Sequence, residues 1–135
     1  MSNPISSYLG FQADALPLRE QRLKLIASNL ANADTPGYRA RDIDFNAALE
    51  AATVARQSGG QPTLEPRADH FALGLDQGLQ AFETVRLSSQ PSIDGNTVDP
   101  DAERAAYGRA ALEYRASLNF LESKVRTLLT AITGQ

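Results

Sequence analysis

The stretch that decides the fold is residues 99–134, DPDAERAAYGRAALEYRASLNFLESKVRTLLTAITG. Asp99 followed by Pro100 is a typical N-cap and first helical residue, and two acidic residues in the next turn suit the positive end of a helix dipole. No further proline occurs before Gly134, which is a typical C-terminal cap. These features predict one helix of about 34 residues, roughly 50 Å long at 1.5 Å per residue.

Apolar residues recur along this helix in two rows of seven, three or four residues apart. One row is Ala111, Leu118, Val125 and Ile132, and the other is Tyr107, Tyr114, Leu121 and Leu128. This pattern is typical of a coiled-coil seam. Leu112, Phe120 and Leu129 lie off both rows, so one partner helix would not cover them. We therefore expect the terminal helices to complete their burial between molecules; the alternative is that they pack only on each other within one domain.

The N-terminal region has a second apolar stripe of helical period, between residues 14 and 33. Its members are Leu16, Leu23 and Leu30 at intervals of seven, with Ile26, Ala27 and Ala33 on the same side. We expect Pro17 either to start this helix or to kink it. The helix should end near Asp34, because residues 35–38, TPGY, are typical of a type II turn with Gly37 at the position of positive φ.

The middle of the chain predicts less regular structure. Residues 46–56 favour a short helix, and residues 93–98, IDGNTV, favour a tight turn, with a small β-hairpin as one option. Residues 71–87 are ambiguous, because two glycines interrupt any helix there. The predicted fold class is mainly α, with long N- and C-terminal helices that form a coiled-coil-like pair and an irregular middle segment.

We divide the chain into three parts within one structural domain. Residues 1–45 hold the N-terminal helix and turn, residues 46–98 form a loop-rich middle segment, and residues 99–135 form the C-terminal coiled-coil helix. The two helical ends have balanced charges, and the middle segment carries the whole net charge of −3. Balanced, mixed charge favours packing against other helices over binding to phosphate.

Composition argues against several classes of function. The 135 residues carry a net charge of −3, which gives nucleic acid no attraction. There is no cysteine, which excludes thiolate metal sites and thiol nucleophiles, and His70 is the one imidazole. Residues 94–99 miss the calcium-loop pattern, and no phosphate-binding glycine loop is present. We expect no enzyme, no cofactor and no metal. We also expect no membrane span and, from residues 1–11, no cleavable signal peptide.

Two stretches carry a resemblance to a known family. Residues 27–45, ASNLANADTPGYRARDIDF, closely resemble the N-terminal signature of bacterial flagellar rod proteins, within the wider family of rod, hook and hook-associated proteins. Residues 90–99, QPSIDGNTVD, resemble the segment before the C-terminal helix in the same family. The resemblance covers residues 8–48 and 88–135 well and residues 49–87 poorly.

The resemblance implies a structural subunit of the proximal rod of the flagellar basal body. Such proteins pack their terminal helices as concentric coiled coils along a hollow rod, so that residues 1–45 would belong to the inner axial layer. It also implies a periplasmic location, type III export without a cleaved signal peptide, and transmission of motor torque. The implied partners are further copies of the chain, the rod proteins FlgC and FlgF, the adaptor FliE, the export gate and the inner-membrane ring, with no nucleic acid and no small-molecule substrate.

Two alternatives stay open at this point. One is another rod subunit, of the FlgC type, against which the ADTPGY turn argues. The other is a helical export adaptor or chaperone that binds a partner helix and does not polymerise. Such an adaptor would fold stably alone and stay in the cytoplasm.

The expected subunit interface combines both helices with the turn that follows the first. Its predicted residues are Leu23, Ile26, Asn29, Leu30, Asn32, Pro36, Gly37, Tyr38, Arg41, Asp42, Asp44, Tyr114, Leu118, Leu121, Val125, Leu128 and Ile132. The two asparagines are expected to bond either helix-end carbonyls or a neighbouring subunit's loop. The alternating charges of residues 39–44 are expected to pair with the next subunit and fix its register, with a solvated loop and a local salt bridge as the alternative.

Overall fold

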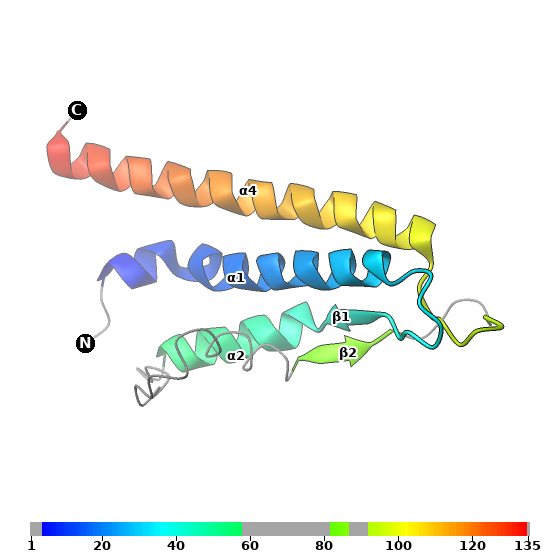
Figure 1. The fold of residues 1–135 in the computed structure, drawn as a ribbon. Coiled ribbons are helices and arrows are strands. Elements are labelled where there is room, and N and C mark those ends of the chain that lie inside the picture. The colour runs from blue at the N-terminus through cyan, green and yellow to red at the C-terminus, as the bar shows by residue number, and fades with distance from the viewer. Residues whose placement is uncertain (1–3, 58–81, 87–91, 135) are drawn as a thin grey trace, which may run out of the picture.

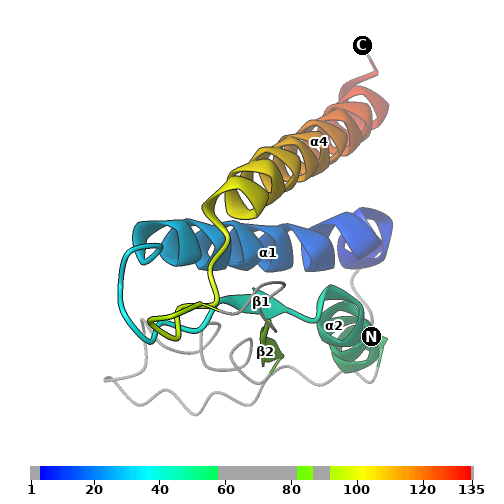
Figure 2. The same cartoon turned by 90° about the vertical axis from the view of Figure 1, so that its right-hand side faces the viewer.

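Helix α1 lies in the middle of the molecule, between a second long helix and a smaller layer. The computed structural model describes residues 4–57, 82–86 and 92–134. The elements are α1 (Pro4–Ala31), β1 (Arg41–Ile43), α2 (Phe45–Gln57), β2 (Glu83–Val85) and α4 (Pro100–Thr133). Helix α4 covers one side of α1, and α2 with the two strands covers the other (Figures 1 and 2). The mainly α fold class is confirmed.

The two long helices run antiparallel in a regular register. Three contacts link Asn29 with Glu103, Arg19 with Glu113 and Tyr8 with Lys124, over 3.4, 2.7 and 2.9 Å. The residue numbers of each pair add to the same total, so the register holds along the whole contact. On this register the last residues of α4 pass beyond the start of α1 at Pro4, as Figure 1 shows at the C-terminal end.

Helix α4 has the bounds that its capping residues predict. The side chain of Asp99 accepts hydrogen bonds from the backbone N–H groups of Asp101 and Ala102. At the other end Gly134 takes a left-handed conformation, with φ 71°, and its N–H donates to the carbonyl of Thr130. The helix is confirmed as one uninterrupted element of 34 residues.

Helix α1 starts earlier than the sequence predicts and bends at a different residue. It begins at Pro4, and its non-helical dihedral angles are at Gly10, with φ 42° and ψ −127°. Glycine takes such angles at little cost because it has no Cβ. The prediction that Pro17 starts or kinks the helix is wrong, since Pro17 lies inside it, seven residues beyond the bend. The helix ends at Ala31, close to the predicted end.

The buried face of α1 also differs from the predicted stripe. The core consists of Leu18 and Leu25 of α1 with Ile43 and Ala48, and Phe45, Leu49 and Phe82 pack against it. Of the predicted stripe only Ile26 is buried. The row of Leu16, Leu23 and Leu30 is half-buried, and Ala27 is exposed. A helix that lies between two layers buries residues on two sides, so a single seven-residue row does not describe it.

The turns and the short helix follow their predictions, and the strands do not. The type II turn is confirmed, since Gly37 has φ 73° and the N–H of Tyr38 bonds the carbonyl of Thr35 over 3.2 Å. The turn at residues 92–95 and helix α2 are also confirmed. The optional hairpin at residues 93–98 does not form. Strand β1 pairs antiparallel with β2, forty residues along the chain, in the register Arg41↔Val85.

Candidate functional site

The two stretches that carry the family resemblance meet at one end of the molecule, which we call the junction (residues 28–44 and 92–98). The N–H of Gly37 donates to the carbonyl of Asp94 over 2.9 Å, and the N–H of Thr97 donates to the carbonyl of Tyr38 over 3.0 Å. A Cβ on Gly95 would lie 3.7 Å from the Cα of Gly37. The two glycine turns therefore pack directly against each other.

Asn96 ties these turns to the end of α1. Its buried Nδ2 donates to the carbonyls of Asn32, Ala33 and Thr35 over 3.0, 2.7 and 2.9 Å. Its Oδ1 accepts from the N–H of Val98 over 2.8 Å. These carbonyls follow directly on the C-terminus of α1, and Asn96 supplies them with a donor from 61 to 64 residues away. Sequence reasoning missed this role, because the signal in the sequence is only an asparagine after a tight turn.

Asn29 and Asn32 are both bonded within the chain. Asn29 is fully buried; its Nδ2 donates to the carbonyl of Arg41 over 2.7 Å, and its Oδ1 accepts from the N–H of Arg41 over 3.0 Å and from Tyr38 Oη over 3.2 Å. Asn32 donates to the carbonyl of Ser28 over 2.8 Å. Asn32 therefore makes the expected bond to a helix-end carbonyl, whereas Asn29 bonds the backbone of strand β1 instead. Asn29 joins α1 to strand β1.

A network of ion pairs crosses all the layers beside the junction. Asp42 accepts from Arg22 over 3.1 and 3.2 Å and from Arg86 over 2.6 Å. The second terminal nitrogen of Arg86, Nη1, donates to Glu103 over 2.7 Å, and Glu103 is 1% exposed. Burial by itself would raise the pKa of Asp42, but hydrogen bonds from Arg86, Arg22 and the N–H of Ile43 outweigh it, so the pKa lies below the ordinary 3.8.

The charges of residues 39–44 are thus largely engaged inside the chain. Asp42 holds the network, and Asp44 accepts from the N–H of Ala47 over 3.1 Å at the start of α2. Arg41 pairs with Glu83 across the small sheet over 3.4 Å, on the surface. Arg39 is exposed. These contacts match the alternative of local salt bridges, which the sequence left open.

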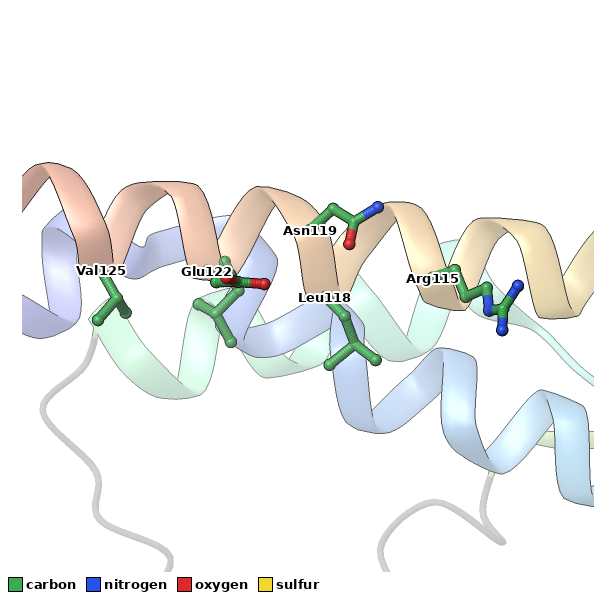
Figure 3. Close-up of a pocket in the computed structure, with 6 residues that line it drawn as sticks. Arg115, Leu118, Asn119, Glu122 and Val125 are labelled. Atoms are coloured by element: carbon green, nitrogen blue, oxygen red, sulfur yellow. The ribbon is translucent and has the colours of Figure 1, made fainter.

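The C-terminal half of α4 (residues 118–133), which we call its outer half, exposes apolar side chains to solvent. The residues of α4 that are buried in the subunit are Glu103, Ala110 and Ser117, which are small or polar. Leu118 and Val125 are 39% and 41% exposed, and Ile132 is 80% exposed. In Figure 3 Leu118 and Val125 project from the same side of α4, along a hollow of about 720 Å³ that Arg115, Asn119 and Glu122 also line. We call Leu118, Val125, Leu129 and Ile132 the apolar ridge.

The predicted interface residues fall into three groups by burial. Ile26 and Asn29 are buried, and an intermediate group is half-buried: Leu23, Leu30, Asn32, Tyr38, Asp42, Tyr114, Leu121 and Leu128. The exposed group is Pro36, Gly37, Arg41, Asp44, Leu118, Val125 and Ile132. The structure therefore places the buried group inside the subunit, covers the intermediate group in part, and leaves the exposed group on its surface.

The described residues hold few groups for chemistry. Among them, no group of three or more histidine, cysteine or carboxylate side chains could hold a metal ion. No helix in this part of the chain is long and apolar enough to cross a membrane. His70, the one imidazole of the sequence, lies outside the described residues.

Comparison with known proteins gives a consistent result. Residues 9–39 match the family model described as flagella basal body rod protein. The chain is 38% identical over 99% of both chains to the flagellar basal body rod protein FlgB of Salmonella typhimurium. It is 44% identical to FlgB of Aeromonas hydrophila, over 93% of this chain and 92% of that protein, and 42% identical to FlgB of Cereibacter sphaeroides, over 94% of both.

The matched region contains α1 from residue 9 onward and the TPGY turn of the junction. The full-length matches extend the similarity through the outer half of α4. The FlgC-type alternative has no support from these relatives, which all carry the name FlgB. The chain belongs to the FlgB family of flagellar basal body rod proteins, and it is a structural subunit of the rod in the flagellar basal body.

Proposed function

We propose that this rod subunit polymerises helically in the proximal rod through α1 and α4, and that it links the inner-membrane ring and export gate to the distal rod and transmits torque. The apolar ridge on α4 is the observation that carries the proposal. Its side chains are too exposed to stabilise the isolated subunit much, and burial against neighbours would contribute about 25 cal/mol per Å². Contiguous exposed apolar surface of this kind is typical of a protein interface.

The length of α4 supports the same proposal. On the antiparallel register its last residues extend past the start of α1, and Leu129 and Ile132 lie in that extension. A helix end that lacks cover from its own chain and carries large apolar side chains suits a contact between successive subunits. The interface we propose comprises the ridge and the exposed members of the predicted set.

The partners follow from the rod location. We propose further copies of the chain, FlgC, FlgF, FliE, the export gate and the inner-membrane ring as neighbours, and a periplasmic position reached without signal cleavage. The name of the relatives, basal body rod protein, supports assembly with rod components. We assign the chain no catalytic role, because its relatives are structural rod proteins.

The export adaptor that the sequence left open has no support from the relatives, which are named basal body rod proteins, and it would use the apolar ridge differently. An adaptor would bind one partner helix there and would be absent from purified rods. A rod subunit would be a stoichiometric component of them. The following variants therefore use incorporation into basal bodies as the measurement.

The test replaces ridge residues with aspartate. Val125→Asp and Ile132→Asp would place a charge in the subunit contact, and burial of an unpaired carboxylate costs several kcal/mol. We expect both variants to fail to restore swimming to a strain that lacks the gene, and to be missing from purified basal bodies. The free energy of unfolding of the isolated Ile132→Asp chain should stay within about 0.5 kcal/mol of the parent, because this side chain is largely exposed.

Ser123→Asp is the matched control. Ser123 is exposed on the same helix and lies two positions from Val125, about 200° around the helix axis. This variant adds the same charge away from the ridge and should assemble and swim normally. Normal swimming and incorporation of the Ile132→Asp subunit would contradict the proposed assembly.

A further inference from the structure

The flank of α4 opposite the apolar ridge holds a small polar pocket, which we call the arginine pocket. It has a volume of about 300 Å³ and is lined by Arg22 of α1, Arg86 after β2, Arg109 and Glu113 of α4, and three alanines of α4. Arg109 and Leu118 are nine residues apart, about two and a half helical turns, so they point to opposite sides of α4. The pocket and the ridge are therefore separate surfaces.

The arginines retain hydrogen-bonding capacity toward this pocket. A guanidinium has five N–H donors. Arg22 uses two nitrogens on Asp42, and Arg86 uses one on Asp42 and one on Glu103. Both side chains remain about one-third exposed. Arg109 makes no hydrogen bond or ion pair within the described residues.

The three arginines of the pocket differ in whether a carboxylate of the same chain neutralises them. Asp42 and Glu103 lie on the inner side of Arg22 and Arg86 and neutralise them, and the lowered pKa of Asp42 reflects the strong donors around it. Arg109 is the cation beyond these pairs, and the carboxylate of Glu113 is the group that would compete for it. The alanines add no polar group, so a ligand meets guanidinium groups above an apolar floor.

The volume limits what can enter. At about 30 Å³ for each water molecule, the pocket holds roughly ten waters. That is enough for an extended carboxylate side chain, and too little for a helix or a folded element. Guanidinium groups bind carboxylates with charge-assisted, often bidentate hydrogen bonds.

We propose that the arginine pocket accepts a glutamate or aspartate side chain from a neighbouring protein chain in the rod, with Arg109 as the main contact and Glu113 as the competing group. The proposal rests on the assembly proposed above. The apolar ridge would supply most of the affinity between subunits, and a charged contact on the other flank would fix their register, since complementary charges contribute specificity more than affinity.

The test uses the isolated chain and a blocked tetraglutamate peptide at low ionic strength. The NMR signals of the arginine Nε–H groups report the contact. We expect a saturable shift of the Arg109 signal, and a loss of affinity of at least fivefold in Arg109→Ala. Glu113→Gln should bind about two- to fivefold more tightly, because it removes the competing carboxylate. Arg126→Ala, an exposed arginine of α4 outside the pocket, should bind as the parent does.

Three results would overturn the proposal. These are no saturable shift with tetraglutamate, an equal shift with blocked tetraglutamine, or binding of inorganic phosphate as tight as that of tetraglutamate, which would make the pocket a general anion site. In cells, Arg109→Ala should reduce the fraction of complete rods, and Arg109→Lys should restore part of it.

Each of the two proposals can be contradicted without the other. Normal assembly of Ile132→Asp would contradict the proposed function, whatever the peptide does. Blocked assembly of Ile132→Asp together with absent peptide binding would contradict the arginine pocket alone.

Discussion

The junction and the outer half of α4 differ in whether their side chains find partners within the chain. At the junction the buried polar side chains are bonded within the chain: Asn96 bonds three carbonyls, and Asn29 bonds strand β1. Along the outer half of α4 the apolar side chains of Leu118 and Ile132 face solvent. The first region is complete within the subunit, and the second is not.

The difference shows which forces specify the subunit and which remain for assembly. Hydrogen bonds are directional, and each donor or acceptor has few partners, so a satisfied polar junction defines one arrangement of one chain. Apolar burial is non-directional and increases with the area removed from water. An exposed apolar ridge can therefore be buried by a neighbouring chain without disturbing the junction. The following predictions test this division by weakening the junction.

Asn96→Ala should have the largest effect on the isolated chain. It leaves the carbonyl of Ala33 and the N–H of Val98 without a partner, and it removes one of the two donors from the carbonyls of Asn32 and Thr35. Since each unpaired buried group costs about 1–3 kcal/mol and water will reach some of them, we expect a loss of about 2–4 kcal/mol. Urea unfolding followed by circular dichroism measures it.

Ile93→Ala is the control for Asn96→Ala. Ile93 lies in the same loop and is fully exposed, so the free energy of unfolding should not change measurably. A loss below about 0.5 kcal/mol for Asn96→Ala would mean that the junction is not what defines the subunit, and the comparison with α4 would lose its basis.

Asp42→Asn should have a smaller effect that depends on pH. The pKa of Asp42 is lowered below 3.8 in the folded chain, so its ionised form stabilises the fold above about pH 4, and this contribution is lost as the pH falls below 3.8. At neutral pH we expect the variant to be about 1–2 kcal/mol less stable, because two charge-assisted contacts are weakened. The difference from the parent should shrink between pH 4 and pH 3.

Urea unfolding at pH 7, 5, 4 and 3 measures this pH dependence. Asp34→Asn removes an exposed carboxylate near the end of α1 and serves as the control for charge alone. A difference between parent and Asp42→Asn that stays constant down to pH 3 would show that the ion pairs do not stabilise the junction through the charge of Asp42.

Gly37→Ala should have the smallest effect of the three. Gly37 has φ 73°, and no atom lies within 4 Å of the position of an added Cβ, so the expected cost of about 1 kcal/mol comes from the backbone alone. Gly108→Ala makes the same chemical change in the interior of α4, also without a contact within 4 Å, and should stabilise the chain by about 0.5–1 kcal/mol.

The comparison tests whether the two glycine variants change the stability of the chain in opposite directions. Thermal unfolding of both in the same buffer compares them directly. Equal effects of the same sign would mean that the turn conformation of Gly37 does not limit the stability of the junction.

Local signals in the sequence predicted where helices and turns begin and end more accurately than which face of a helix is buried. Asp99, Pro100 and Gly134 define both ends of α4, and Pro36 with Gly37 define the turn, because capping and turn preferences act within a few residues. The seven-residue row of leucines on α1 did not predict the buried face, because that face depends on the two layers between which the helix lies.

The candidate site was predicted in part. The exposed members of the predicted interface, such as Val125 and Ile132, follow from heptad spacing. From the sequence, Glu103 is only an acidic residue in the first turn of a helix. Its ion pair with Arg86 joins two residues 17 positions apart on different elements, so local patterns do not predict it. No spacing rule relates Asn96 to Ala33 or Arg22 to Asp42, which the fold brings together.

The sequence by itself determined the long C-terminal helix, the type II turn and the family, because each depends on residues close together in the chain. The tertiary structure alone decided that Asn96 bonds the chain after α1, that β1 pairs with β2, that the bend lies at Gly10, and that α4 buries the row of Glu103, Ala110 and Ser117. These features depend on contacts between distant segments, which form only where the layers meet. The same packing leaves the apolar ridge of α4 uncovered for a neighbour.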